Sequence, residues 1–466
     1  MTSYKTPAVY VEEISTFPPS VAEVSTAIPA FIGYTEKADR VTPGDLTNKP
    51  TRISSMLDYE TLFGKAEATA LTIPINSPLE TPPVDSTTEP IPPFNPPDVN
   101  YFMYYALRLY FDNGGGSCYI VSVGSYSDPV TKTKDDFIKG LEALKKEDEP
   151  TLILFTDAVN LPTVQDYHDL CQAALAQCNE LKDRFAIFDV KHSLEPAGGV
   201  ETLKIAEEVQ AFRDNIGTED LKYGAAYYPY LQTSINYYYT DDSVTMADSK
   251  TLTENKGKTE FYNRVKAELA KKRVVLPPSA GVAGVYASVD RDRGVWKAPA
   301  NVSLASVIGP TLKINNQEQE NLNIEPTSGK SINAIRSFTG KGTLVWGART
   351  LAGNDNEWRY IPVRRLFNLI EESIQKSTSF VVFESNNAIT WLKVKTMVET
   401  YLEGLWRQGA LAGATPEKAF FVNVGLGKSM TTQDILEGRL IVEIGIAAVR
   451  PAEFIILRFS HKLQEA

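Results

Sequence analysis

Between residues 118 and 231 the chain alternates short apolar runs with longer amphipathic ones, and this alternation is the strongest constraint on its fold. The short runs have strand length and many β-branched and aromatic residues, whereas the longer runs repeat apolar residues at helical spacing. Strands that alternate with helices of this length imply right-handed βαβ crossovers and a largely parallel sheet covered on both faces. The predicted strands are CYIVSVG, TLILFTD, FAIFDV and YGAAYYPYL, and the predicted helices are DDFIKGLEALKKED, TVQDYHDLCQAALAQCNELKD and ETLKIAEEVQAFRDNIG.

The last third of the chain changes character and predicts a compact α+β domain. PVRRLFNLIEESIQKSTSFVVF indicates a helix followed by a strand. The next helix begins behind an asparagine cap and places apolar residues at spacings of three and four, which gives it one buried face. The residues of that face are Trp391, Val394, Val398, Leu402 and Leu405. The remainder predicts a strand at AFFVNV, a turn, a short helix and a strand within GRLIVEIGIAAV.

A proline-rich segment, residues 74–98, precedes the alternating region. Because proline lacks a backbone donor and fixes φ, this segment can neither pair in a sheet nor continue a helix. We therefore expect an extended linker or a surface loop that separates an N-terminal piece from the alternating region. With 466 residues the chain is also too long for one compact core, so two or three domains are expected.

The charge balance and the apolar pattern exclude several classes of protein. The chain has 58 acidic and 47 basic residues, a formal net charge of −11, which argues against a nucleic-acid groove because such a groove needs clustered Lys and Arg. No run approaches the roughly 20 apolar residues that span a bilayer. The N-terminus also lacks the pattern of a signal peptide. We expect a soluble protein that binds no nucleic acid and does not insert into a membrane.

The three cysteines do not predict a disulfide framework or a metal site. Cys118, Cys171 and Cys178 are too few for a framework and suit a reducing cytoplasm. His168 lies close to two of them, but on a helix positions 171 and 178 are two turns apart, about 10 Å by helical rise. That distance is too long for one ion, so buried thiols on the apolar face are the favoured interpretation.

Asp157 and Asp189 are the most enzyme-like residues. They end two predicted strands at the carboxyl edge, where open α/β sheets bind their ligands. Carboxylates there also cap the following helix or close a turn, and we favour that interpretation. A serine-hydrolase triad is not supported, because His168, His192 and His461 lie in no recognisable motif and no G-x-S-x-G elbow occurs. We expect no catalytic residue, cofactor or metal, and keep an α/β enzyme using the two aspartates as the alternative.

The GLGKS stretch, residues 425–429, resembles the end of a phosphate-binding P-loop. It follows a predicted strand and precedes a predicted helix, as a P-loop does. The first glycine of that motif falls at Val422, however, and a β-branched residue does not easily make the required turn. The favoured interpretation is a strand-to-helix connection in which Thr431 or Thr432 caps the helix. A nucleotide-dependent ATPase is the third hypothesis.

Both ends of the chain carry an apolar strand. Near the start, PAVYVEEI alternates like a strand and FPPS stops it; near the end, EFIILRF follows Pro451. Proteins normally suppress exposed strand edges, because such edges attract other chains. One hypothesis is that each end adds a strand to a sheet in a neighbouring subunit. The other is that both strands pair within their own chain.

The chain resembles the tail sheath proteins of contractile phage tails and contractile injection systems. The similarity covers most of the length and occurs in one order along the chain. RGVWKAPAN and RPAEF are its most specific parts. The matching segments are PAVYVEEI, STAIPAFIGYTEKA, LFG at residues 62–64, GGGSCYIV, LPPSAGVAGVYASVDRDRGVWKAPAN, VWGARTL, EWRYIPVRRL, TWLKVKTMVETYLEGLWRQGAL and GRLIVEIGIAAVRPAEFIILRF.

The resemblance implies a structural subunit rather than an enzyme. Sheath subunits of this family stack as six-fold rings around an inner tube and contract from a metastable extended state to drive the tube through a target envelope. Their terminal arms are exchanged between subunits. Carried over to this sequence, the arm residues are Val9, Tyr10, Val11 and Glu12 at the N-terminus and Phe454, Ile455, Ile456 and Leu457 at the C-terminus. The implied acceptor strand contains Leu440, Val442 and Ile444, and the implied tube contacts are Lys428, Asp434 and Arg439.

The resemblance also implies a division of the chain, its partners and its location. It divides the chain into an exchanged arm (1–22), an N-terminal segment with the proline-rich linker (23–110), an outer subtilisin-like, non-catalytic α/β domain (111–350), an inner C-terminal domain (351–450) and a second exchanged arm (451–466). The implied partners are further copies of the chain, the inner tube protein, baseplate and tail-terminator or cap proteins, and sheath paralogues. Assembly is expected in the cytoplasm, followed by release in a phage tail or an extracellular injection particle.

Overall fold

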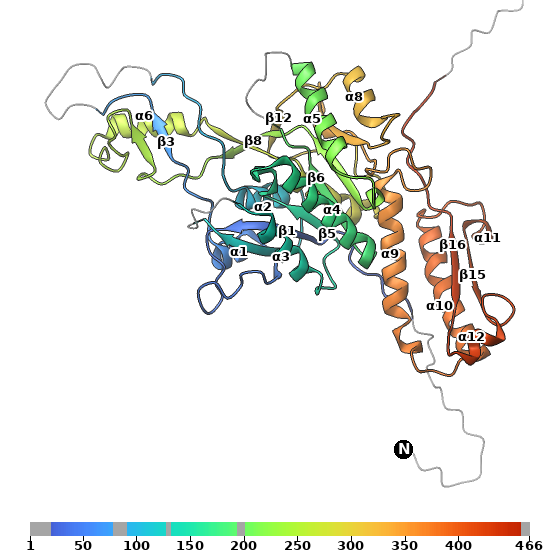
Figure 1. Cartoon of the computed structure of the whole chain (residues 1–466). Helices are drawn as coiled ribbons and strands as arrows, with labels where there is room; N and C mark the ends of the chain where they lie inside the picture. Colours follow the sequence, from blue (N-terminus) through green and yellow to red (C-terminus); the bar gives the residue numbers. More distant parts are fainter. Residues whose placement is uncertain (1–19, 78–90, 127–131, 193–200, 458–466) are drawn as a thin grey trace, which may run out of the picture. The chain divides into compact units, whose positions relative to one another are not determined.

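The computed structural model describes residues 20–77, 91–126, 132–192 and 201–457. These residues form two compact units (Figure 1). The α/β unit contains residues 25–369 and 450–457, and the C-terminal unit contains residues 20–24 and 370–449. The first residues of the described chain therefore group with the C-terminal unit, and the last ones group with the α/β unit.

A largely parallel sheet forms the centre of the α/β unit, as the alternating pattern predicts. In the described chain it has nine strands in the order β11-β14-β13-β7-β6-β5-β1-β4-β2. The six strands from β13 to β4 run parallel, and antiparallel strands close both edges. Their bounds are β1 (Pro29–Thr35), β2 (Thr51–Ile53), β4 (Cys118–Ser125), β5 (Leu152–Phe155), β6 (Phe185–Asp189), β7 (Gly224–Tyr228), β11 (Val302–Ser303), β13 (Ile332–Phe338) and β14 (Gly342–Val345).

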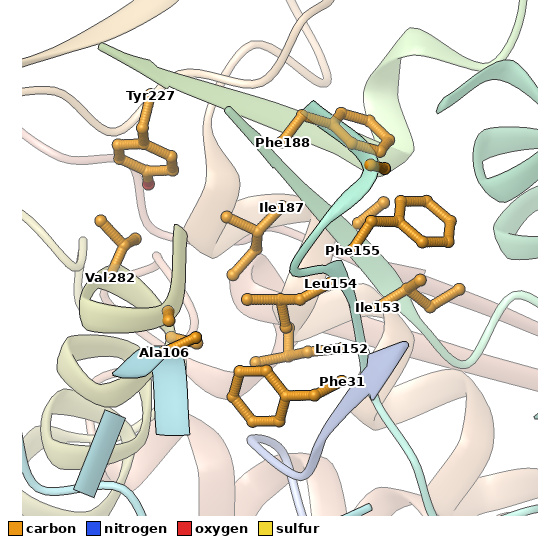
Figure 2. Close-up of a cluster of buried hydrophobic side chains, with 14 of the residues drawn as sticks. Phe31, Ala106, Leu152, Ile153, Leu154, Phe155, Ile187, Phe188, Tyr227 and Val282 are labelled. Carbon is orange, nitrogen blue, oxygen red and sulfur yellow. The ribbon is translucent and has the colours of Figure 1, made fainter. Parts of the chain in front are cut away.

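Helices cover both faces of this sheet. They are α1 (Met56–Phe63), α2 (Met103–Asp112), α3 (Lys134–Leu144), α4 (Val164–Leu181), α5 (Glu201–Asn215), α7 (Ser279–Arg293) and α8 (Asn316–Asn323). Successive residues of β1 face opposite layers: the Phe31 ring contacts Tyr110 of α2 with centroids 5.2 Å apart, whereas Ile32 faces α3. Figure 2 shows the layer on the first face, where Phe31, Leu152, Leu154 and Ile187 lie beside Ala106 of α2 and Val282 of α7.

Strand β1 belongs to the central sheet, although it lies within the predicted N-terminal segment. The sequence prediction put residues 23–110 in a separate N-terminal segment, but β1 lies inside the sheet between β4 and β5. All seven of its residues are buried. The alternation of short apolar runs with amphipathic helices predicts strands between residues 118 and 231, and residues 29–35 lie before that region.

The predicted strand YGAAYYPYL is two strands rather than one. The chain turns at Pro229, which has no backbone N–H to continue β7, and resumes as β8 (Leu231–Asn236). Strand β8 pairs with β10 (Arg273–Leu276) and β12 (Val307–Pro310) in a second sheet. A small satellite core lies beyond it, formed by β3 (Leu71–Ile73), β9 (Val244–Met246) and α6 (Thr259–Leu269). Residues 91–98 of the proline-rich segment have no regular structure, as expected, and Phe94 packs on the satellite core.

The C-terminal unit holds two long helices and a two-stranded sheet. Its elements are α9 (Ile361–Ser377), which begins in the α/β unit, α10 (Ala388–Arg407), α11 (Pro416–Ala419), β15 (Phe420–Val424), α12 (Thr432–Leu436) and β16 (Val442–Ile446). The predicted asparagine cap of α10 is confirmed, because Asn387 accepts hydrogen bonds from Ile389 N and Thr390 N. The strand predicted at SFVVF is wrong. A 3₁₀ turn at Ser379–Val381 takes its place, and none of the described strands pairs with these residues.

Asp157 and Asp189 are buried groups that fix the starts of helices. Asp157 accepts hydrogen bonds from Phe102 N, next to α2, and from Tyr34 N, at 2.5 and 2.9 Å. Asp189 accepts from the N and Oγ of Ser279, the first residue of α7, at 2.8 and 2.6 Å. Both carboxylates are thus used to hold α2 and α7 on the sheet. The capping interpretation expected them to cap the helix that follows each strand or to close a turn, but α2 precedes Asp157 in the chain and α7 follows Asp189 only after α5 and α6. Burial raises the pKa of Asp189 to about 7, against the lowering effect of the Ser279 bonds.

This pKa predicts that the stability of the protein depends on Asp189 and pH. The ordinary pKa of an aspartate is 3.8, so between pH 4 and 7 the folded state keeps a proton that the unfolded state has lost. The free energy of unfolding then falls with rising pH, by up to about 4 kcal/mol for a shift of this size. Asp189→Asn cannot ionise and should lose this fall. Urea unfolding at pH 4.5 and 7.5 measures it; a variant-minus-wild-type difference that is equal at the two pH values would contradict the prediction.

The close packing of α2 on α7 makes a second prediction. A Cβ added at Gly284 would lie 2.6 Å from the Tyr110 carbonyl oxygen, so the two helices would have to move apart. Gly284→Ala should lower the free energy of unfolding by about 1–3 kcal/mol. Gly281→Ala in the same helix is the matched control, since its Cβ meets the ends of two flexible side chains, Leu109 at 3.2 Å and Leu304 at 3.4 Å, and no backbone atom. It should be neutral or stabilising. Chemical denaturation of both variants tests the difference, and equal effects would refute it.

Candidate functional site

The N-terminal arm begins at a hydrogen-bonded root on α9. The predicted arm residues, 9–12, lie outside the described residues. The described chain reaches α9 through two backbone amides: Ala22 N donates to Ser377 Oγ at 3.1 Å, and Val24 N donates to Ser373 Oγ at 3.2 Å. These bonds hold the segment that leads towards the predicted strand.

The C-terminal arm, residues 451–466, is described as far as residue 457. Over its described residues, 453–457, the predicted strand at EFIILRF is not formed, and residues 450–457 have no strand partner in the described chain. A strand needs a neighbour for its N–H and C=O groups, and without one the backbone stays irregular. The consequence is an exposed apolar run of four residues: Phe454, Ile455, Ile456 and Leu457 are 65%, 80%, 76% and 72% exposed.

Glu453, the residue before this run, is tightly bound to the α/β unit. Its Oε2 lies 2.6 Å from Arg349 Nη2 and its Oε1 lies 3.0 Å from Arg349 Nε. Asn323 Nδ2 donates to Oε1 at 2.7 Å and the Tyr360 hydroxyl donates to Oε2 at 3.2 Å. Burial works to raise the pKa of Glu453, but the bonds and charge of Arg349, with Asn323 and Tyr360, hold it below its usual value.

The predicted acceptor residues lie at or next to an open strand edge. Val442 and Ile444 belong to β16, whereas Leu440 lies two residues before it. Strand β16 pairs antiparallel with β15, and just beyond it Ala447 N donates to Ala419 O at 2.8 Å. Residues two apart on a strand turn their backbone groups the same way.

The outer edge of β16 is therefore defined by the strand register. Glu443 and Gly445, which share the direction of Ala447, turn their N–H and C=O groups towards β15. Val442 and Ile444 turn theirs away from it, and no described strand pairs with that edge (Figure 1). Opposite them on β15, Val424 and Val422 are buried, and α10 packs on that strand. The sheet that carries this edge thus packs on α10, and the outward N–H and C=O groups of β16 have no partner in a described strand.

The GLGKS stretch is a closed turn rather than a phosphate cradle. Lys428 N and Met430 N donate to Gly425 O, at 3.1 and 3.2 Å, and Gly427 N donates to Met430 O at 2.9 Å. Ser429 Oγ donates to Ile441 O at 2.6 Å, which ties the turn to the start of β16. The amides and the hydroxyl that a P-loop turns towards phosphate are occupied here, and this agrees with the sequence interpretation.

The predicted tube-contact residues surround this turn. Thr431 caps α12, which confirms one of the two predicted caps, and Asp434 completes a capping box. Asp434 also pairs with Arg439 at 2.9 Å, and Arg439 pairs with Glu437 at 2.5 Å. Lys428 is exposed. The structure thus brings Asp434 and Arg439 together, and Lys428 stands in the same turn-and-helix segment.

The described residues give no support to a metal site. Cys171 and Cys178 are fully buried free thiols on α4, as expected. His168 on the same helix uses Nδ1 on Val164 O at 2.7 Å. Among the described residues no group of three or more His, Cys, Asp or Glu side chains could hold a metal ion. None of the described helices is long and apolar enough to cross a membrane.

Sequence reasoning missed two features of these surfaces. The Glu453 site escaped it because Arg349 and Asn323 lie 104 and 130 residues away in sequence. The second feature is the connection between α9 and α10, where Val382 and Phe383 are exposed and Phe383 has a left-handed φ of 70°. The apolar residues of this connection are the signal that the sequence offers, and their composition predicts a strand instead.

Comparison with known proteins identifies the family. Residues 132–351 match the phage tail sheath protein central domain, and residues 353–462 match the phage tail sheath C-terminal domain. A chain in the contracted helical sheath of the anti-feeding prophage is 32% identical, with a TM-score of 0.64, over 99% of this chain and 100% of that one.

Two further relatives agree. A chain of the contracted sheath complex of PVC, an extracellular contractile injection system, is 31% identical with a TM-score of 0.64, over 100% of this chain and 99% of that one. The tail sheath protein of Enterobacteria phage T4 is 26% identical over 171 residues, which are 36% of this chain and 24% of the phage protein. The match therefore spans about a quarter of that relative. From two matched domains and full-length similarity to solved sheath chains, this chain belongs to the phage tail sheath family.

Proposed function

We propose that the chain is the structural subunit of a contractile sheath. It polymerises as stacked six-fold rings around an inner tube, and contracts from a metastable extended state to drive the tube through a target envelope. No hydrolysis is required, because the energy is stored during assembly and released as interfaces between nearly rigid subunits repack. The proposal includes a subtilisin-like fold for the α/β unit, which lacks the catalytic triad of subtilisin and serves as a scaffold.

One observation carries the proposal: the described residues include an exposed apolar run without a strand partner and, at the same time, an unpaired strand edge. The exposed run 454–457 has no strand partner within the described chain, and the outer edge of β16 offers unpaired backbone groups. Joining the two between copies makes several backbone bonds at about 1 kcal/mol net each. Burying each of the apolar side chains adds roughly 1.5–3 kcal/mol. Repetition of this link in every subunit makes the polymer durable.

The remaining partners are inferred from family membership and stay proposals. The segment around Lys428, Asp434 and Arg439 contacts the inner tube protein. Baseplate proteins, tail-terminator or cap proteins and sheath paralogues bind the ends of the polymer or share it. The subunit assembles in the cytoplasm and then forms part of a released phage tail or extracellular injection particle.

The enzyme alternative is weaker on this structure. Asp157 and Asp189 are fully buried, and their hydrogen bonds go to backbone amides and to hydroxyls of Thr156 and Ser279. A carboxylate used in this way is not presented to a substrate. The sheath relatives are structural proteins, which favours the same conclusion.

Removal of an arm should abolish assembly without unfolding the subunit. We expect a chain ending at Glu453, or one lacking residues 1–16, to keep the thermal unfolding of the wild type and to stay monomeric. Ile456→Asp should act in the same direction, because it places a charge in the joined strand. Sedimentation and negative-stain electron microscopy measure the outcome. Polymers of normal length from the truncated chains would refute the arm hypothesis.

Proline on the outer edge of β16 tests the acceptor. The Ile444 N–H points away from β15, so Ile444→Pro removes a donor from the free edge while leaving the β15 pairing in place. Polymerisation should fall at least about tenfold, which corresponds to loss of one or two backbone bonds. Ile444→Thr, which keeps the N–H, is the control and should polymerise normally. Equal polymerisation of the two variants would show that this edge accepts no strand.

A further inference from the structure

Glu453 is where the described part of the C-terminal arm is held. Within residues 450–457 it is the residue that hydrogen-bonds to the rest of the described chain. The last backbone bond before it is Val449 N to Ala410 O at 3.2 Å. The exposed run starts at the very next residue, Phe454. Glu453 therefore lies at the boundary between the part of the chain that is hydrogen-bonded to the fold and the exposed run 454–457.

Arg349, the main partner of Glu453, is itself anchored in the central sheet. Its side chain is 4% exposed. Arg349 N donates to Asn333 Oδ1 at 2.8 Å, and Asn333 Nδ2 donates back to Arg349 O at 2.8 Å. Asn333 belongs to β13, a strand of the parallel sheet. A chain of hydrogen bonds thus connects the arm to a strand of the central sheet of the α/β unit.

We propose that the Arg349–Glu453 pair is a fixed joint, which holds the root of the C-terminal arm on the α/β unit and passes to that unit any pull exerted on residues 454–457. This inference rests on the proposed exchange of arms between copies. It adds that the arm is held at Glu453, instead of being free to move from the end of β16 onwards.

The joint works by lowering the entropy cost of strand exchange. An arm that starts from a fixed point searches a smaller volume, so its effective concentration at a neighbouring edge is higher. The two-pronged geometry of Arg349 suits this task, because a guanidinium that holds both carboxylate oxygens fixes direction as well as distance. Partial burial of the pair keeps solvent from screening it.

The two arm roots are attached to different units. The N-terminal root is bonded to Ser373 and Ser377 and groups with the C-terminal unit, whereas Glu453 groups with the α/β unit. A polymer joined by both arms would then pull on both units of every subunit. This arrangement assigns the C-terminal arm the task of moving the α/β unit with the lattice.

Proteolysis of the dilute monomer tests the joint without any polymer. Endoproteinase Glu-C cuts after glutamate, so its rate at the Glu453–Phe454 bond reports how firmly Glu453 is held. Arg349→Gln should raise that rate at least about tenfold, the loss expected when a charge-assisted pair is removed. Arg349→Lys, which keeps the charge but not the fork, should fall between. Cleavage at the exposed Glu437 normalises the rates. Unchanged cleavage at Glu453 in Arg349→Gln would overturn the joint.

Polymerisation tests the consequence, with a matched pair as the control. Glu453→Gln should need about ten times more protein to polymerise than the wild type. The control is Asp183→Asn, which weakens a similar Arg–carboxylate pair: Asp183 lies 2.7 Å from Arg184 Nε, with side-chain exposures of 13% and 1%, against 21% and 4% for Glu453 and Arg349. It belongs to the same unit and lies in neither arm, so it should polymerise as the wild type does.

The outcomes separate the two proposals. Normal polymerisation of Glu453→Gln overturns the joint and leaves the sheath proposal intact. Equal loss of polymerisation in Glu453→Gln and Asp183→Asn also overturns the joint, since the cause is then a general loss of stability. A wild type that forms no polymer, alone or with its tube protein, contradicts the proposed function and with it the transmission of pull through Glu453.

Discussion

An extended backbone must find hydrogen-bond partners, and this requirement organises the molecule. In the α/β unit it is met internally, by the parallel strands from β13 to β4 and by antiparallel strands at both edges. In the C-terminal unit it is met on one side of β16 and left open on the other. The exposed apolar run at residues 454–457 is the complementary case, a segment with strand composition and no partner. Unpaired strand edges and exposed apolar segments attract other chains, and the proposed exchange would join these two.

The rest of the fold serves to hold these two features in place. Buried carboxylates at Asp157 and Asp189 seat α2 and α7 on the sheet, and Gly284 lets those helices approach closely. The sheet in turn carries Asn333, which orients Arg349, which holds Glu453. The stability of the core and the position of the arm are therefore linked through named contacts. In the proposed sheath, the change on contraction would occur at the interfaces between subunits while these internal contacts are kept.

Much of the fold could be predicted from periodicity, and the errors have common causes. The alternation between residues 118 and 231 predicted the parallel sheet, because long amphipathic helices and short buried strands differ in period. It did not place β1, whose seven buried residues lie before that region and so fall outside the alternation of strands and helices. SFVVF and EFIILRF have strand composition but no neighbouring strand in the described chain, and composition alone does not supply a partner. The resemblance to sheath proteins indicated the family, which the comparisons confirmed.

The candidate site was only partly predictable for a related reason. Val442 and Ile444 could be placed on a strand from their apolar alternation, but which edge they turn outwards depends on the register with β15. Glu453 looked like an ordinary polar residue of the arm, because its partners come from distant parts of the sequence. Contacts of this kind are set by the tertiary fold.

The most direct test of the account is a cryo-electron microscopy map of the polymer formed by the purified chain with its inner tube protein. The account predicts hollow cylinders in which residues 454–457 of one copy pair with the outer edge of β16 in the next copy. Glu453 should still be bound to Arg349 of its own chain in that map. An arm folded back onto its own β16, or a preparation that remains monomeric at high concentration, would contradict it.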